Sequence, residues 1–168
     1  AIETLDAVPG RMQRIDSEAD EPLIIIDFAH TPDALEKVLI SLRMHIEGKL
    51  ICVFGCGGDR DWRKRPFMGE IVERYADMHI ITNDNPRSED PQEIVQQIRA
   101  GLKTPRRMPV ILDREEAIRA ALDVATKGDC VLIAGKGHED YQLIGDQRLS
   151  FSDQKVVEQL LREQRGQA

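Results

Sequence analysis

Five short apolar runs recur along this 168-residue chain, and stretches with helical spacing separate each run from the next. The runs are Leu23–Ile26, Leu50–Phe54, Met78–Thr82, Val110–Leu112 and Cys130–Ala134. Each has the length of a β-strand, and strands that alternate with helices predict a parallel sheet covered on both faces. We therefore predict an α/β fold with a Rossmann-like, mostly parallel sheet and helices on both of its faces.

Signals for helix starts lie between the apolar runs. Each start combines a capping side chain with a proline at the first helical position, with a glutamate three residues later, or with both. The three starts are Thr31-Pro32, Asp90-Pro91 with Glu93, and Asp113 with Glu116. A last helix is predicted from Ser152 to about Gln164, because apolar residues recur there at helical spacing.

The remaining segments predict two smaller features. Tyr141–Leu149 alternates around the turn residues Gly145-Asp146, which predicts a small β-hairpin near the C-terminus. Met12–Ile15 is expected to form an edge strand. Because 168 residues, 41% of them hydrophobic, suffice for one core, we expect residues 1–168 to form a single domain.

Charge and cysteine content exclude several classes of partner. With 23 basic and 30 acidic side chains, the net charge of −7 argues against binding to a nucleic-acid backbone. No apolar run is long enough to cross a membrane, and no signal peptide is visible. Cys52 and Cys130 lie inside apolar runs, and Cys56 has no neighbour at metal-ligand spacing. We therefore expect a reducing, cytoplasmic location and no metal site.

The order of the elements predicts where a ligand binds. All strands of a parallel sheet end at the same edge, and ligands of such folds bind in the crevice outside those ends. Four loops of unusual composition should meet there, at residues 27–30, 55–60, 84–87 and 135–139. Ordinary solvated loops would not be expected to gather glycine, histidine, arginine and acidic residues at one edge.

The loop Asp84-Asn85-Pro86-Arg87 has the features of a carboxylate site. Pro86 stiffens the loop, and the planar guanidinium of Arg87 suits a bidentate bond to a carboxylate or phosphate. The alternative is an arginine that contacts only solvent. Positive charge is also concentrated after the second run, in the residues Arg60, Arg63, Lys64 and Arg65. Such a cluster suits an anionic small molecule or, equally, an exposed helix start.

Two glycine-rich loops depart from the known phosphate-binding motifs. Gly55-Cys56-Gly57-Gly58 lacks the third glycine of the dinucleotide fingerprint, because Arg60 stands there. Gly135-Lys136-Gly137 lacks the first glycine and the hydroxyl residue of a Walker A loop. We expect these glycines to let the backbone approach a ligand closely, and Glu139 to accept hydrogen bonds from an ammonium group.

Asp27 and His30 follow the first run and allow three interpretations: a catalytic acid–base pair, nucleotide contacts, or caps of the helix start. His30 directly precedes Thr31-Pro32 and adds nothing to capping, which favours contact with a ligand. The predicted edge thus offers two arginines, an asparagine, a glutamate and open backbone. That set suits a zwitterion with carboxylate and ammonium ends, such as an amino acid.

These motifs resemble those of the Mur ligases, in particular the branch that adds meso-diaminopimelate. The similarity covers nearly the whole chain and rests on Gly10–Met12, Asp27–Asp33, Phe54–Asp61 with Lys64-Arg65-Pro66, Asp84–Arg87 and Gly135–Gln142. The resemblance implies the C-terminal, amino-acid-binding domain of such a ligase. It implies that the carboxylates of diaminopimelate are held by Arg60, Asn85 and Arg87. Its distal ammonium would be held by Gly135 and Glu139.

The same resemblance implies that Arg11, Asp27 and His30 close over the nucleotide, while ATP and Mg²⁺ are bound mainly by a separate central domain. Phe28 replaces the tyrosine usual in this motif. In the family, ATP activates the D-glutamate carboxylate of UDP-MurNAc-L-Ala-D-Glu as an acyl phosphate, which the amine of the incoming amino acid attacks. The resemblance thereby implies a role in peptidoglycan synthesis, and through it in cell-wall biogenesis, cell shape and cell division.

The N-terminal UDP-sugar domain and the central ATPase domain of the family are expected to be absent from this sequence. We therefore expect the isolated chain to contain no catalytic residue and to have no ligase activity. One alternative is a free-standing module that binds a nucleotide or an amino acid without catalysis. Another is a related ligase domain that adds lysine or glutamate. Arg87 is the main argument against the latter, because lysine lacks the distal carboxylate.

Overall fold

The computed structural model describes residues 10–105 and 109–166 of the chain. Its elements are β1 (Gln13–Ile15), β2 (Leu23–Asp27), α1 (Pro32–Arg43), β3 (Leu50–Phe54), α2 (Lys64–Tyr75), β4 (Met78–Ile81), α3 (Pro91–Arg99), α4 (Arg114–Val124), β5 (Cys130–Ala134), β6 (Tyr141–Ile144), β7 (Gln147–Ser150) and α5 (Asp153–Gln164). The predicted α/β fold is confirmed. Among the described residues, no helix is both long enough and apolar enough to cross a membrane.

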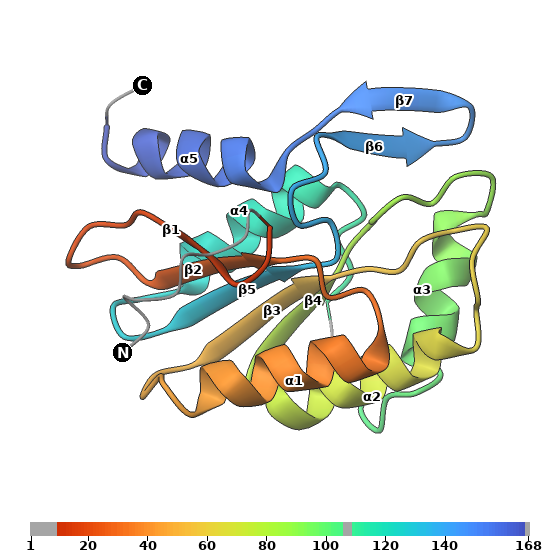
Figure 1. The fold of residues 1–168 in the computed structure, drawn as a ribbon, viewed down its shortest axis with the longest axis horizontal. Helices are drawn as coiled ribbons and strands as arrows, with labels where there is room; N and C mark the ends of the chain where they lie inside the picture. The colour runs from red at the N-terminus through yellow and green to blue at the C-terminus, as the bar shows by residue number, and fades with distance from the viewer. Residues whose placement is uncertain (1–9, 106–108, 167–168) are drawn as a thin grey trace.

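The central sheet has five strands in the order β1-β2-β5-β3-β4. The last four run parallel, whereas β1 pairs antiparallel with β2 at the edge, as predicted for this segment. The predicted hairpin is also present, because β6 pairs antiparallel with β7, apart from the central sheet (Figure 1). A bridge between Arg87 and Ile144 connects the hairpin to the loop that follows β4.

One predicted strand is wrong: Val110–Leu112 forms only an isolated bridge, in which Val110 lies parallel to Ile81. Two backbone hydrogen bonds hold the bridge, from the N–H of Ile81 to Pro109 and from the N–H of Ile111 to Ile81, each 3.0 Å long. The ladder cannot continue towards Pro109, because proline has no N–H to donate. Three apolar residues between this proline and the next helix start are therefore too few for a regular strand.

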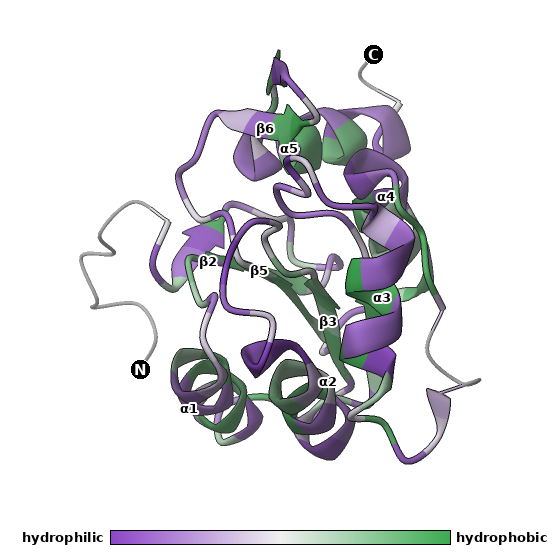
Figure 2. Ribbon diagram, turned by 90° about the vertical axis from the view of Figure 1, so that its right-hand side faces the viewer, coloured by the Kyte–Doolittle hydropathy of each residue, from purple (hydrophilic) through white to green (hydrophobic). Residues whose placement is uncertain are grey.

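Helices cover both faces of the central sheet, α1 and α2 on one side and α4 and α5 on the other (Figure 1). Side chains of successive strand residues alternate between the two layers. Ile25 and Leu132 pack in the core beneath α1 and α2, and Ile24 and Ile133 in the core beneath α4 and α5. Every residue of β3 and β5 is buried, and Figure 2 shows these strands as the hydrophobic centre between polar helix surfaces. This packing fixes the edge at which the strands end.

The predicted helix starts are confirmed by side-chain caps. The hydroxyl of Thr31 accepts a hydrogen bond from the N–H of Ala34, and the carboxylate of Asp113 accepts one from the N–H of Glu116. Asp90 caps α3 through the N–H of the second residue that follows it. Such caps satisfy N–H groups that the helix itself leaves unpaired. They therefore define where the loops that follow β2 and β4 end.

Candidate functional site

A cavity of about 420 Å³ lies at the carboxyl ends of the parallel strands. We call it the rim cavity. Its lining comes from all four predicted loops, from the start of α2 and from β6, and comprises Phe28, His30, Thr31, Gly57, Arg60, Asp61, Lys64, Asp84, Asn85, Arg87, Gly135, Glu139 and Tyr141. The prediction that these loops converge is confirmed. All five residues expected to hold an amino acid are among the lining residues.

A hydrogen-bonded network joins the loop after β4 to the loop after β5. The amide nitrogen of Asn85, which is 3% exposed, donates to Oε2 of Glu139 over 3.1 Å. Its oxygen accepts from the ammonium of Lys136 and from the N–H of Leu143, both at 3.0 Å. The same ammonium donates to Oε2 of Glu139, also over 3.0 Å. Asn85 and Glu139 are therefore held in fixed orientations before any ligand arrives.

The hairpin and the loop after β3 together position Arg87. Its backbone, in the left-handed region at φ 51°, donates to Leu143 and accepts from Gly145. Its Nη1 donates to the carbonyl oxygen of Gly58 over 2.9 Å. A Cβ at Gly57 would lie 3.0 Å from this nitrogen, so glycine gives the guanidinium its room. Contact with carbonyl oxygens through Nη1 leaves the other nitrogens of the guanidinium for a ligand.

The four residues of the predicted basic cluster have three different surroundings. Arg60 is exposed and lines the rim cavity with Lys64, which donates to the carbonyl oxygen of His30 over 2.6 Å. Arg65 does not belong to the cavity, and its inclusion in the cluster was wrong. It is fully buried and bonded to both carboxylate oxygens of Glu89 at 2.7 and 2.9 Å. A buried arginine needs such a partner, so its charge serves folding. Arg63 is exposed and lies outside the cavity lining.

Gly135 and Asp84 form the floor of the rim cavity. Gly135 has φ +114°, and a Cβ there would lie 2.7 Å from Oδ2 of Asp84, so both conformation and space require glycine. Asp84 is 7% exposed. Burial raises the pKa of its carboxyl, while the nearby cations Arg114 and Lys136 oppose that rise. The floor thus presents a carboxyl group whose charge depends on its cationic neighbours.

The three residues assigned to the nucleotide differ in their surroundings. His30 lines the rim cavity; its Nδ1 lies 2.8 Å from the carbonyl oxygen of Phe28, and the two rings meet edge to face. Asp27 is buried, and its oxygens accept from the N–H groups of Met12 and Ala29, both at 2.7 Å. Asp27 does not cap α1, because Thr31 does so; its assignment to the nucleotide stays a prediction. Arg11 is exposed and lies outside the cavity lining.

Sequence reasoning missed two residues of the site. Lys136 stands in the glycine-rich loop that departs from a Walker A motif, and a lysine between two glycines at a strand end is a usable signal for it. Tyr141 lines the rim cavity from β6, and the Lys136 ammonium lies 5.4 Å from its ring centre. Nothing in the sequence indicated that the hairpin folds back against the loop after β4.

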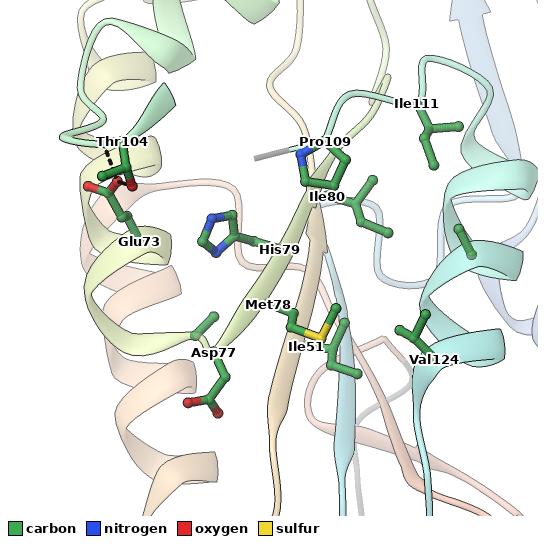
Figure 3. Close-up of a pocket in the computed structure, with 12 residues that line it drawn as sticks. Ile51, Glu73, Asp77, Met78, His79, Ile80, Thr104, Pro109, Ile111 and Val124 are labelled. Carbon is green, nitrogen blue, oxygen red and sulfur yellow. Dashed lines mark hydrogen bonds between the residues drawn. The ribbon is translucent and has the colours of Figure 1, made fainter. Parts of the chain in front are cut away.

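A second hollow, of about 440 Å³, lies along β4 at its amino end (Figure 3). We call it the edge hollow. Its lining is mostly apolar and comprises Ile51, Glu73, Ala76, Asp77, Met78, His79, Ile80, Thr104, Pro109, Ile111, Ala120 and Val124. Figure 3 shows Glu73 turned to Thr104, which donates to it over 2.7 Å. No residue predicted to bind a ligand lies here, so the rim cavity is the candidate site although it is slightly smaller.

The cysteines and acidic residues give no sign of a metal centre in the described residues. No group of three or more histidine, cysteine, aspartate or glutamate side chains in residues 10–105 and 109–166 is arranged to hold an ion. Cys56 is buried in the loop after β3, and burial raises the pKa of its thiol to about 12. It therefore stays protonated and unreactive near neutral pH.

Residues 10–137 match the family described as Mur ligase, glutamate ligase domain. The chain belongs to this family. A curated relative from Coxiella burnetii, the UDP-N-acetylmuramoyl-L-alanyl-D-glutamate--2,6-diaminopimelate ligase, is 56% identical over 160 residues, which are 95% of this chain and 32% of the relative. The chain thus spans about a third of the length of the curated relatives it matches.

Two solved structures extend the relationship to the Mur ligase fold. A UDP-N-acetylmuramoyl-L-alanyl-D-glutamate--2,6-diaminopimelate ligase shares 46% identity with a TM-score of 0.88, covering 96% of this chain and 33% of that one. A bifunctional folylpolyglutamate synthase/dihydrofolate synthase from Yersinia pestis, complexed with AMPPNP and Mn ion, shares 27% identity with a TM-score of 0.60. It covers 78% of this chain and 29% of that one. The resemblance to Mur ligases seen in the sequence is confirmed.

Proposed function

We propose that this chain is the amino-acid-selecting domain of an ATP-dependent ligase. The ligase would add meso-diaminopimelate to UDP-MurNAc-L-Ala-D-Glu in the cytoplasm, as a step of peptidoglycan synthesis. The observation that carries the proposal is the rim cavity, where the cations Arg60 and Arg87 and the acids Asp84 and Glu139 line one space. Diaminopimelate carries two carboxylates and two ammonium groups, and relatives 56% and 52% identical to the chain are named for its addition.

The binding groups still available in the cavity suit those two kinds of charge. Arg60 and Arg87 would each take a carboxylate through a charge-assisted, forked pair of hydrogen bonds. Asn85 donates one amide hydrogen to Glu139 and has a second for the ligand. Within the described residues, Oε1 of Glu139 has no hydrogen bond and would accept from the distal ammonium together with the carbonyl oxygen of Gly135. Arg87 is then the group that lysine leaves without a partner.

The amino-acid domain would contribute orientation rather than bond-making groups. The reaction is the attack of the bound amine on an acyl phosphate of D-glutamate, with release of phosphate after ADP has formed. Fixed hydrogen bonds on both ends of the amino acid hold this amine in one direction, which lowers the entropic barrier to attack. None of the described residues in this domain is assigned to proton transfer or to Mg²⁺.

ATP and Mg²⁺ would be held mainly outside this chain and would supply the activation of the carboxylate. A related solved ligase is complexed with AMPPNP and Mn ion, which supports nucleotide and metal use in the complete protein. Here, His30 at the cavity and the exposed Arg11 fit a contact with phosphates or base. Asp27 is bonded to the N–H of Met12, so its role would be to hold the segment that carries Arg11.

Arg87→Ala in the complete ligase tests the assignment of the amino acid. We expect KM for diaminopimelate to rise about 100-fold or more, because a carboxylate of the substrate would lose its charged, hydrogen-bonding partner. KM for ATP should change less than about twofold. Arg63→Ala is the matched control, since Arg63 is exposed near the same edge and lies outside the cavity lining. Steady-state kinetics with each substrate varied in turn measures both constants.

Equal rises of both Michaelis constants in Arg87→Ala would reject this role. So would efficient use of lysine by the wild-type ligase, because a site built around a charged partner should reject an analogue without it by roughly 10⁴-fold. The isolated chain should release no ADP when all three substrates are present, since the proposal places ATP binding mainly outside this chain. Turnover by the isolated chain would contradict the proposal that ATP is bound mainly outside it.

A further inference from the structure

Lys136 is the most deeply buried charged group at the rim cavity. Its side chain has no exposed area, and its ammonium lies 3.0 Å from Oδ1 of Asn85 and 3.0 Å from Oε2 of Glu139. Oδ1 of Asp84 lies 3.8 Å away, and the ring of Tyr141 flanks the same ammonium. The partners come from three separate segments: the loop after β4, the loop after β5, and β6.

Burial of an ammonium group is costly unless opposite charge and hydrogen bonds compensate for it. Two carboxylates, Asp84 and Glu139, supply the opposite charge here, and Asn85 supplies a further acceptor. The compensation is mutual, because Asp84 and Glu139 would repel each other without the cation between them. Lys136 is therefore a cross-link between the two walls of the cavity, placed where no solvent competes with it.

The network around Lys136 uses some of the hydrogen-bonding groups of Glu139 and Asn85 and leaves others without a partner in the described part of the chain. One oxygen of Glu139 accepts from both Lys136 and Asn85, whereas the other has no hydrogen bond within the described residues. The Asn85 oxygen accepts from Lys136 and Leu143, so its amide nitrogen must point to Glu139 and to the cavity. Removal of Lys136 would leave Glu139 held by its hydrogen bond from Asn85 alone, and would take one of the two hydrogen bonds from the Asn85 oxygen. Because Lys136 binds one oxygen of Glu139 and the oxygen of Asn85, the other Glu139 oxygen and one amide hydrogen of Asn85 are left for a ligand.

We propose that Lys136 is a positioning residue for the amino-acid substrate, which acts through Glu139 and Asn85 and does not touch the substrate itself. It sets the direction in which the site presents one carboxylate oxygen to an ammonium and one amide hydrogen to a carboxylate. This inference rests on the proposed function, since it names a further residue on which recognition of diaminopimelate depends. It also assigns the lysine of the loop Gly135-Lys136-Gly137 a role other than phosphate binding.

Lys136→Met in the complete ligase tests the inference, because methionine keeps the length of the side chain without its charge. We expect KM for diaminopimelate to rise about 10- to 100-fold, because the hydrogen bonds from the ammonium to Glu139 and Asn85 are lost. KM for ATP should stay within about twofold of the wild type. Lys37→Met is the matched control: Lys37 is an exposed lysine of α1 that pairs with Asp33 and lies outside the cavity lining.

A double-mutant cycle with Glu139→Gln separates positioning from a general structural role. If Lys136 acts through Glu139, the Lys136→Met change should raise KM for diaminopimelate far less in the Glu139→Gln background than in the wild type. Should Lys136→Met alone fail to fold, the double variant Lys136→Met/Glu139→Gln removes both charges together. It is then compared with Glu139→Gln alone, and similar KM values support the inference.

Three results would overturn the role of Lys136. They are an unchanged KM for diaminopimelate in Lys136→Met, an equal rise of the constants for diaminopimelate and ATP, or fully multiplicative effects of the two substitutions. Failure of the proposed function looks different, because the wild-type ligase itself would then not consume diaminopimelate. A wild type that uses diaminopimelate, with a Lys136→Met variant of unchanged KM, rejects the positioning role alone.

Discussion

The rim cavity and the edge hollow are nearly equal in size, about 420 and 440 Å³, but differ in what lines them. In the rim cavity, cations such as Arg87 and acids such as Glu139 come from different loops and face one space. In the edge hollow, Ile80, Ile111 and Val124 dominate. Volume alone would favour the edge hollow. Convergent charge of both signs identifies the rim cavity, because only charged groups can fix the orientation of a zwitterion.

The two cavities also differ in what holds their walls. Beneath the rim, Arg114 at the start of α4 makes a fully buried ion pair with Asp153 at the start of α5, at 2.8 Å. The same guanidinium donates to the carbonyl oxygens of Asn83 and Ala134, the residues where β4 and β5 give way to loops. The walls of the edge hollow are held by apolar packing in the core beneath α4 and α5. Substitutions should therefore fail in different ways at the two places.

The largest effect should come from Arg114→Met. Loss of one partner leaves the Asp153 carboxylate buried without its cation, which costs about 3–5 kcal/mol of unfolding free energy. Urea denaturation measures this cost. Arg119→Met is the matched control on the same helix, because Arg119 is 36% exposed and its pair with Glu163 should contribute less than about 1 kcal/mol. If the two variants lose the same free energy of unfolding, the buried ion pair does not stabilise the rim more than an exposed one does.

Ile80→Ala should have the next largest effect, on stability alone. Ile80 is 7% exposed and packs in the core beside the edge hollow. Its truncation enlarges an existing space and should cost about 2–4 kcal/mol. In the complete ligase, KM for diaminopimelate should not change. Val124→Ala, at a position 46% exposed in the same lining, should cost much less. A rise in KM with Ile80→Ala would show that the edge hollow takes part in substrate binding.

Much of this contrast could be predicted from the sequence. Alternating apolar runs and capped helix starts imposed a parallel sheet, and a parallel sheet places all its strand ends at one edge. The convergence of the loops with Arg60, Asn85, Arg87 and Glu139 followed from that topology alone. Only Val110–Leu112 was wrong as a strand, because a flanking proline limits its ladder.

Side-chain pairing could not be predicted. Arg60 and Arg65 are both arginines of one short segment, yet one lines the cavity and the other is buried against Glu89. Their difference depends on where α3 and the loop before it pack, which no local pattern encodes. The same holds for Lys136, whose partners lie on two loops and a hairpin. Along the chain, Lys136 is 51 residues from Asn85 but only three from Glu139. Local composition reveals that charge is present, but tertiary packing decides which charges remain for a ligand.

The smallest effect should come from His79, the one histidine of the edge hollow. It is partly buried, and its Nδ1 has no hydrogen-bond partner within the described residues. Burial lowers the pKa of His79, against an opposing effect of the nearby Glu73 charge. The unfolded chain, with a histidine pKa of about 6.5, therefore binds a proton before the folded chain does. The stability that neutral His79 contributes is full above that pH and is lost as the pH falls through the lower, folded pKa.

His79→Gln should remove this titration, so that acidification from neutral pH to about pH 5 destabilises the wild type more than the variant. Thermal unfolding of both proteins at a series of pH values measures the difference. His45→Gln, which alters an exposed ring on the surface, is the matched control. A difference between wild type and His79→Gln that does not vary with pH would contradict the burial of a neutral ring. If the stability difference between the two proteins grows on acidification, one added charge is enough to destabilise the edge hollow. The rim cavity, in contrast, contains several charged side chains.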